Sequence, residues 1–180
     1  MKILVAVTGG ISAYKAVDVI SALKKNGHYV SAMATESALE FVSENVLKIT
    51  ADKYWEHSWA EPIHINATDD VEVFTIVPAT ANIIAKIVYG LADDLVSSTV
   101  IALPKDCLKM IFPCMNSRMI DNVVVQRNIE CLKKDGWVVI EPDVGMLACG
   151  TVGKGKIHPT KYIVEKILEN QELFLKQPLA

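Results

Sequence analysis

Cys149 stands in the segment of this sequence best suited to acid–base or nucleophilic chemistry. It lies in ACGTVGKGK at 148–156, where three glycines fall within six residues. Such a stretch predicts a flexible flap, over about 142–156, rather than a piece of core. A thiol on a closing flap can donate a proton or attack an electrophile. Cys107, Cys114 and Cys131 are more simply explained as small buried hydrophobes.

PATAN at 78–82 places polar side chains where an apolar run gives way to a helix pattern. Thr80 and Asn82 offer a hydroxyl and an amide beside a new helix N-terminus. The small Ala79 and Ala81 would let a flat ring approach the backbone. Taken alone, the segment is more simply explained as an ordinary capped helix.

Asn116, in PCMNSRM at 113–119, could direct a neutral amide at a carboxylate. In isolation, a helix cap is the simpler role for it. Met115 and Met119, four residues apart, are typical of packing residues or of adaptable walls of an apolar slot.

His64, in PIHI at 62–65, precedes a strand pattern and is the histidine with the better catalytic case. A lone histidine is more often structural, and His57 has a weaker case still.

The turn VTGGIS at 7–12 places glycines and a hydroxyl at a helix start. Glycine lets backbone N–H groups approach an anion, the helix dipole favours negative charge, and Ser12 can donate. A tight turn capped by Ser12 would explain the same residues. GxGxxG is absent, and Thr35 stands closer to the next strand end than Glu36 does. The pattern therefore favours a mononucleotide with one phosphate over NAD.

Strand and helix patterns alternate along the chain, with short connections. Apolar runs predict strands at 3–7, 29–34, 71–77, 109–112 and 137–140. Helical spacing or cap signals predict helices near 13–26, 35–42, 81–88 and 94–103, a further helix that ends near 134, and a last helix that Pro159 opens. Residues 51–66 and 142–156 read as irregular, and Pro78 and Pro113 as strand stops. We expect one α/β domain over 1–180, Rossmann-like (flavodoxin-like), with helices on both faces of a parallel sheet and ligands at the strands' carboxyl ends.

The composition of the chain argues against some classes of function. The 180 residues are 51% hydrophobic and 22% charged, with a formal charge of −3, which argues against a protein held on nucleic acid. No apolar stretch is long enough to span a membrane. The four cysteines show no zinc or disulfide spacing, so we expect a cytoplasmic protein without a metal site.

Read together, GGISAYK at 9–15, HI at 64–65, PATAN, PCMNSRM and ACGTVGKGK resemble the homo-oligomeric flavin-containing cysteine decarboxylases, over residues 2 to about 170. The resemblance implies an FMN enzyme with catalytic His64, Asn116 and Cys149. It implies cofactor contacts at Gly9, Gly10, Ser12, Thr35, Thr80, Ala81, Asn82, Ile83 and Cys114, and substrate contacts at Asn116, Met119, Ala148, Gly150 and Lys156. The sequence departs from the family pattern at Thr80, Ile83, Cys114, Ile120 and Thr151, the last replacing a commonly acidic residue.

The resemblance also implies a reaction. Direct loss of carbon dioxide from an acylated cysteine would leave a carbanion with no electron sink. The family first oxidises the thiol-bearing carbon to a thioaldehyde, then releases carbon dioxide to form an enethiolate, which is finally reduced. Asn116 would hold the carboxylate, His64 would assist the oxidation, and Cys149 would return a proton.

The expected substrate is phosphopantothenoylcysteine of coenzyme A synthesis, converted to phosphopantetheine. Alternatives are a peptidyl-cysteine decarboxylase of lantibiotic type, a flavin prenyltransferase, and a noncatalytic regulatory subunit. We expect a homotrimer or a higher assembly of trimers, with FMN between subunits. Because the sequence ends at Ala180, we expect a separate synthetase to supply the substrate.

Overall fold

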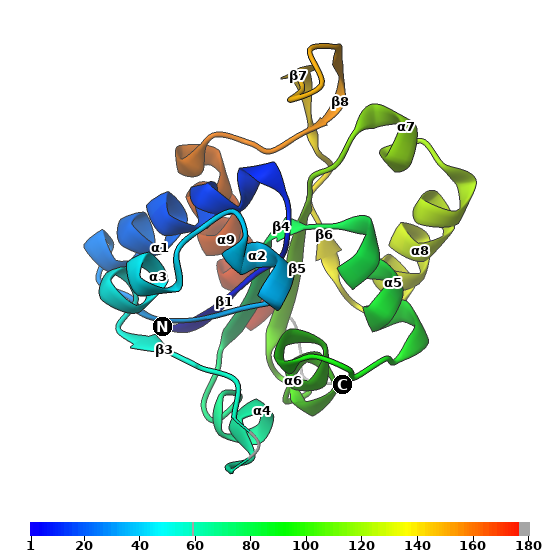
Figure 1. The fold of residues 1–180 in the computed structure, drawn as a ribbon. Helices are drawn as coiled ribbons and strands as arrows, with labels where there is room; N and C mark the ends of the chain where they lie inside the picture. Colours follow the sequence, from blue (N-terminus) through cyan, green and yellow to red (C-terminus); the bar gives the residue numbers. More distant parts are fainter. Residues whose placement is uncertain (59, 177–180) are drawn as a thin grey trace.

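A six-stranded parallel sheet forms the centre of the computed structural model, which describes residues 1–58 and 60–176. The strand order is β3-β2-β1-β4-β5-β6 (Figure 1). The strands are β1 (Lys2–Val7), β2 (Tyr29–Ala34), β3 (Lys53–Tyr54), β4 (Val73–Ala79), β5 (Leu108–Pro113) and β6 (Val138–Val139).

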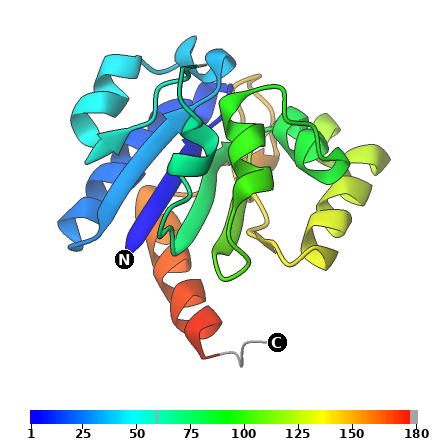
Figure 2. The ribbon, with the colours of Figure 1, turned by 90° about the horizontal axis from the view of Figure 1, so that it is seen from below.

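Two helical layers cover the sheet, because successive strand side chains point to opposite faces and both faces are apolar. In β1, Ile3 and Val5 pack on one side, against α1 (Lys15–Lys25), α3 (Glu44–Thr50) and α9 (Thr160–Leu175). Leu4 and Ala6 pack on the other, against α4 (Ile63–Asn66), α5 (Ala81–Tyr89), α6 (Leu95–Ala102) and α8 (Val123–Lys134). Figure 2 shows the strands side by side with helices around them.

The expected α/β fold with helices on both faces is confirmed. The order 3-2-1-4-5-6 is the Rossmann order, whereas a flavodoxin sheet runs 2-1-3-4-5, so the two share layers and a switch point but not strand order. The order of the strands along the chain reverses between β1 and β4, which are parallel neighbours. The connections that follow them therefore pass to opposite faces of the sheet and leave room for a ligand at the carboxyl ends.

Short helices occupy this carboxyl edge. They are η1 (Ile11–Tyr14), α2 (Glu36–Leu39) and α7 (Ser117–Ile120). Each follows a strand after a short connection, which places its first residues beside the switch point.

The structure corrects the strand limit expected at Pro78. β4 continues through Pro78 to Ala79, because the register with β5 shifts between Ile76 and Ala79. The missing N–H of proline therefore costs no ladder hydrogen bond there. Segment 51–66, expected to be irregular, contains β3 and α4, both too short to show a period.

The glycine-rich segment is also more regular than expected. β7 (Asp143–Met146) and β8 (Val152–Lys156) pair antiparallel in a hairpin. This hairpin projects beyond the carboxyl edge of the sheet (Figure 1). None of the described helices combines the length and apolar composition that crossing a bilayer requires.

Candidate active site

Thr8 joins the segment after β1 to the end of β4 at the switch point. Its hydroxyl donates to the Pro78 carbonyl at 2.7 Å and accepts from the Thr80 N–H at 3.2 Å. The two hydroxyls, Thr8 Oγ1 and Thr80 Oγ1, lie 3.4 Å apart. Sequence reasoning did not select Thr8, although a hydroxyl residue directly before Gly9 at a strand end was an available signal.

Gly9 and Gly10, which follow β1, are glycines for different physical reasons. A side chain at Gly9 would place its Cβ 2.7 Å from the Ser37 carbonyl oxygen, so glycine is needed for α2 to pack here. A Cβ at Gly10 would meet nothing closer than Thr80 Cγ2, at 3.8 Å. Gly10 therefore lines open space, and the predicted cofactor contact is physically available at this glycine.

Thr80 caps α5, its hydroxyl accepting from the Ile83 N–H at 3.3 Å. The N–H groups of Ala81 and Asn82, in the first helical turn, have no intrahelical acceptor and can serve a ligand. The side chain of Ile83, another predicted cofactor contact, is 1% exposed and packs in the core.

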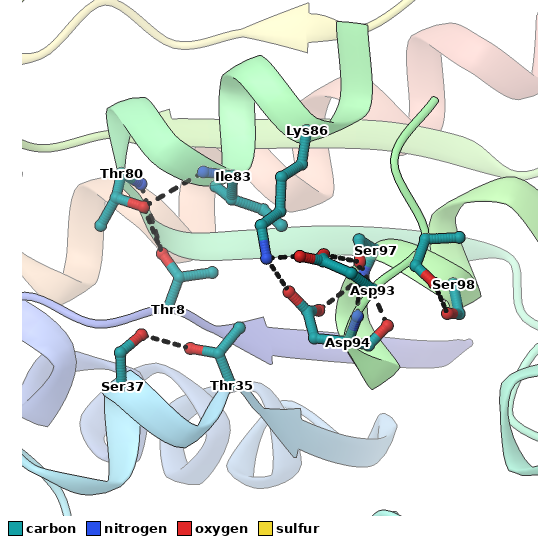
Figure 3. A network of polar contacts seen from close by, with 11 residues as sticks. Thr8, Thr35, Ser37, Thr80, Ile83, Lys86, Asp93, Asp94, Ser97 and Ser98 are labelled. Carbon is teal, nitrogen blue, oxygen red and sulfur yellow. Dashed lines mark hydrogen bonds and ion pairs between the residues drawn. The ribbon is translucent and has the colours of Figure 1, made fainter. Parts of the chain in front are cut away.

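Thr35 and Asn82 line a cleft of about 480 Å³ at the carboxyl edge. Thr35 Oγ1 and Ser37 Oγ lie 3.1 Å apart, and Figure 3 shows both near Thr8 and Thr80. The cleft thus gathers neutral hydroxyl and amide groups from the segment after β2 and from the start of α5.

Lys86 forms a charged cluster at the far side of this cleft (Figure 3). Its ammonium lies 2.7 Å from Asp93 and 2.6 Å from Asp94. Burial opposes the charge on Lys86, but hydrogen bonds to the two carboxylates outweigh it and raise the pKa of the lysine. Asp94 also caps α6, accepting from the Ser97 N–H at 2.8 Å. The cluster joins α5 to α6 and leaves the two carboxylates with one negative charge in excess of the lysine.

A second cleft, of about 320 Å³, lies between the η1 turn, the loop after β5 and the hairpin. Cys114 donates to Ser12 Oγ at 3.2 Å within it. Burial raises the pKa of Cys114, so this thiol stays neutral and acts as a donor. Of the predicted residues, the lining includes Gly10, Ser12, Cys114, Asn116, Ala148, Cys149 and Lys156, but not Met119 or Gly150.

The hairpin docks on the loop after β5 through two glycines. Met115 donates its N–H to the Gly155 carbonyl at 3.1 Å. Gly155 has φ +128°, and a Cβ there would overlap the Met115 carbonyl oxygen. At Gly153, a Cβ would lie 3.1 Å from Ser117 Cβ. These glycines allow close approach, a reason that the sequence reading, which took them as a sign of flexibility, did not consider.

Asn116 caps a helix and also faces the cleft, so the two roles that were weighed as alternatives are compatible. Its Oδ1 accepts from the Arg118 N–H at 2.9 Å and caps α7. Because the acceptor end is occupied by an N–H, the Nδ2 end must face the cleft, where it lies 3.1 Å from Cys149 Sγ. The cap therefore fixes a neutral donor in the cleft.

Cys149 is exposed and surrounded by donors. Thr151 Oγ1 lies 3.1 Å from its sulfur. The Thr151 hydroxyl, then the Thr151 N–H and more weakly the Asn116 amide lower the pKa of Cys149. By contrast, burial raises the pKa of Cys107 to about 12. The surroundings thus favour the charged sulfur at Cys149 and oppose it at Cys107.

His64 lies elsewhere. It lines a third cleft, of about 400 Å³, with His57, Pro62 and Asp94. His57 and Asp94 also line the Thr35 cleft, but no residue of the His64 cleft lines the Cys149 cleft. Within one chain, Asn116 and Cys149 meet, and His64 lies on the other side of the Thr35 cleft.

Similarity to known proteins shows the family of this chain. Residues 1–172 match the family described as Flavoprotein, so the chain belongs to the flavoprotein family. A probable phosphopantothenoylcysteine decarboxylase from Streptococcus mutans is 36% identical, over 93% of this chain and 97% of its own length. A coenzyme A biosynthesis bifunctional protein CoaBC from Bacillus subtilis is 38% identical over 91% of this chain, which spans only 41% of that protein.

Solved structures extend the comparison. A cysteine-to-serine variant of a PPC decarboxylase, complexed with pantothenoylaminoethenethiol, matches with TM-score 0.85 and 25% identity, covering 95% of this chain and 98% of that one. The FMN binding protein AtHal3 matches with TM-score 0.82 and 25% identity, over 99% and 98%. A histidine-to-asparagine variant of EpiD with a substrate peptide matches with TM-score 0.81 and 26% identity, over 93% and 98%.

Proposed function

We propose that this protein decarboxylates phosphopantothenoylcysteine to phosphopantetheine, with FMN as cofactor, in coenzyme A biosynthesis. The observation that carries the proposal is the 3.1 Å contact between Asn116 Nδ2 and Cys149 Sγ, in a cleft lined by the Gly10 turn. It places a neutral amide donor and an acidic thiol together, where a carboxylate and a reactive sulfur must both be handled. Relatives named for this activity support the choice of reaction.

The residues at the switch point fit FMN. Thr35, Ser37 and Thr80 supply neutral hydroxyls, and the α5 N-terminus supplies backbone N–H groups, a donor set suited to a single phosphate. Gly10 and Ser12 leave open space beside them for a flat ring. Lys86 is already neutralised by Asp93 and Asp94, so it does not add a free charge.

Bound FMN would supply reversible hydride transfer, which decarboxylation of a cysteine conjugate requires but no side chain can provide. Asn116 would hold the substrate carboxylate with its Nδ2 hydrogens. A neutral donor suits this step, because a cationic partner would stabilise the carboxylate charge that must disappear as carbon dioxide leaves. The α7 cap holds the amide in the orientation that this role needs.

Cys149 would act after carbon dioxide has left. Its thiol donates a proton to the substrate carbon that carried the carboxylate, and the charge remains on sulfur. Donors around the sulfur stabilise that charge. The hairpin carries the thiol into the cleft, and its closure would exclude water from the reactive intermediate.

His64 would assist the earlier oxidation, and its place in a separate cleft is why we propose that the site is shared between copies. Exposed apolar side chains of α5, α6 and their link, Tyr89, Leu91 and Ile101, lie on the elements that form the His64 side. Such a surface favours association with a second copy. A homotrimer, with His64 of one copy facing Cys149 of another, would complete the site and give the flavin ring a second wall.

Lys156 would meet the phosphate end of the substrate. It lines the Cys149 cleft, and among the described residues no carboxylate lies within ion-pair distance of it. We further propose that a separate synthetase supplies the substrate and that the protein works in the cytoplasm. All four cysteines are free thiols in the structure, which is compatible with a reducing compartment.

A peptide ending in cysteine is the rival substrate, since a variant of EpiD bound to a substrate peptide has a closely similar fold. The deciding experiment incubates purified, FMN-loaded protein with phosphopantothenoylcysteine and, separately, with cysteine-ended peptides. We expect mass spectrometry to detect loss of carbon dioxide from the first. Decarboxylation of the peptide alone would overturn the substrate, and no reaction with either would overturn the activity.

A further inference from the structure

Cys149 has two side-chain neighbours with hydrogen-bonding groups, and only one is explained by substrate binding. Asn116 Nδ2 lies 3.1 Å from the sulfur and has the substrate carboxylate to serve. Thr151 Oγ1 also lies 3.1 Å from the sulfur, and the proposed reaction gives this hydroxyl no other task. Thr151 is also one of the positions at which the sequence departs from the family pattern.

The hairpin turn holds this hydroxyl in place. Leu147 donates its N–H to the Thr151 carbonyl at 2.8 Å, and Gly150 donates to the Leu147 carbonyl at 2.9 Å. Gly150, with φ +81°, allows the tight return that these bonds require. Cys149 and Thr151 therefore stand on one closed turn, and their contact does not depend on how the hairpin docks.

We propose that Thr151 is a positioning residue for proton donation by Cys149, an inference that rests on the proposed function. In the step, the S–H bond of Cys149 breaks, and the π electrons of the enethiolate C=C bond form a C–H bond at the substrate carbon that lost carbon dioxide, while the substrate sulfur forms a C=S bond. The electron pair of the S–H bond stays on sulfur. Before the step either the thiol or the hydroxyl can donate, but the thiolate can only accept, so the Thr151 hydroxyl then donates to it.

The electrostatics agree with this geometry. The Thr151 hydroxyl is the first cause of the lowered pKa of Cys149, ahead of the backbone N–H groups and the Asn116 amide. An acidic residue at 151 would act in the opposite sense, because a carboxylate beside the sulfur disfavours the thiolate. Threonine at this position therefore makes the flap thiol a stronger acid than a carboxylate neighbour would.

The test compares Thr151→Val, which keeps the shape but removes the hydroxyl, with Thr151→Ser, which keeps the hydroxyl. The first readout needs no substrate. FMN-loaded protein is alkylated with iodoacetamide across pH, and the Cys149 peptide is quantified by mass spectrometry. We expect Thr151→Val to move the alkylation midpoint to higher pH and Thr151→Ser to rescue it.

The second readout is the ratio of oxidised enethiol to normal product during turnover. Thr151→Val should raise this ratio about tenfold, as proton return slows while carbon dioxide loss continues, and Thr151→Ser should lower it again. Thr151→Ala serves as a second hydroxyl-free variant if the valine protein does not fold. An unchanged midpoint and an unchanged ratio in a hydroxyl-free variant would overturn the inference alone, whereas wild-type protein that decarboxylates neither substrate would overturn the proposed function.

Discussion

Asn116 and Cys149 touch within one chain, whereas His64 lies in a cleft that shares no residue with theirs. The first pair is held by backbone, since α7 is capped by Asn116 and the hairpin carrying Cys149 docks through Gly153 and Gly155. His64 lies instead on α4, a helix of four residues, near helices that carry exposed apolar side chains.

This difference indicates which proposed catalytic steps one chain can support by itself and which would need a second copy. Carboxylate binding and proton return can be prepared by the fold of a single chain. For His64, the residue proposed for the oxidation, the fold of one chain provides only its own cleft. Association with a second copy would have to bring a His64 side chain to the Asn116 and Cys149 pair. Four substitutions test this distinction.

Asn116→Asp should have the largest effect. Aspartate keeps an oxygen for the Arg118 N–H but replaces the Nδ2 donor by a second oxygen. At about 4 Å and an effective dielectric near 20, repulsion from the substrate carboxylate is on the order of 4 kcal/mol. Decarboxylation should therefore fall about a thousandfold, measured by carbon dioxide release.

Asn122→Asp is the matched control, because Asn122 caps α8 in the same way, accepting from the Val124 N–H at 2.9 Å. It should retain wild-type activity. Equal losses in the two variants would mean that capping, not carboxylate binding, explains Asn116.

His64→Asn should also be inactive, failing before carbon dioxide is lost. If His64 and Asn116 of different copies form one site, mixing the His64→Asn and Asn116→Asp proteins after denaturation and refolding should restore about a quarter of wild-type activity in a symmetric ring. Each variant refolded alone is the control. Complete inactivity of a mixture shown to contain hetero-oligomers would place both residues of a site in one chain.

Some elements of the fold could be predicted from the sequence, and others could not. The strands at 3–7 and 29–34 were predicted nearly to the residue, because strands buried on both faces appear as unbroken apolar runs. β3 was missed because two residues carry no period. Pro78 was misjudged because a register shift between strands leaves no trace in the sequence.

For the site, the local residue patterns and the resemblance to a family selected Asn116 and Cys149 but could not show that they touch. The Thr151 contact depends on a turn conformation, and Gly155 on the approach of a distant carbonyl. Neither is visible in residue spacing. The separation of His64 from Cys149 was equally hidden, since an irregular segment does not reveal which cleft it lines.

Cys149→Ser should block the final reduction of the substrate but not its oxidation or the loss of carbon dioxide. The variant should oxidise and decarboxylate the substrate, then accumulate an enethiol two hydrogens lighter than the normal product. A serine hydroxyl is far less acidic than a thiol, whose pKa is about 8.5 in a free cysteine, so proton return should fail. Mass spectrometry of the products distinguishes the two species.

Cys131→Ser, on α8, is the control for loss of a thiol outside the site. Normal product at an undiminished rate from Cys149→Ser would make the hairpin cysteine structural. The proposed division between an oxidising and a reducing half would then lose its main support.

Lys156→Ala should have the smallest effect, and it tests whether the Cys149 cleft also selects the substrate. The Lys156 stem lies over Gly145, where an added Cβ would be 2.8 Å from Lys156 Cδ, so glycine leaves the lysine its place. Its neighbour Lys154 is paired with Glu141 at 2.7 Å, whereas Lys156 faces the cleft and finds no carboxylate among the described residues. A phosphate on the substrate would supply that missing partner. Losing one such exposed charge pair should raise KM about two- to fivefold while kcat changes little, because the contact is equal in ground and transition states. The wild-type preference for the phosphorylated substrate over its dephosphorylated form should fall by the same factor, with Lys105→Ala, in the loop before β5, as the control. If KM and preference both stay at their wild-type values, the phosphate is bound outside this cleft, and substrate choice, like the oxidation, depends on residues beyond the Asn116 and Cys149 pair.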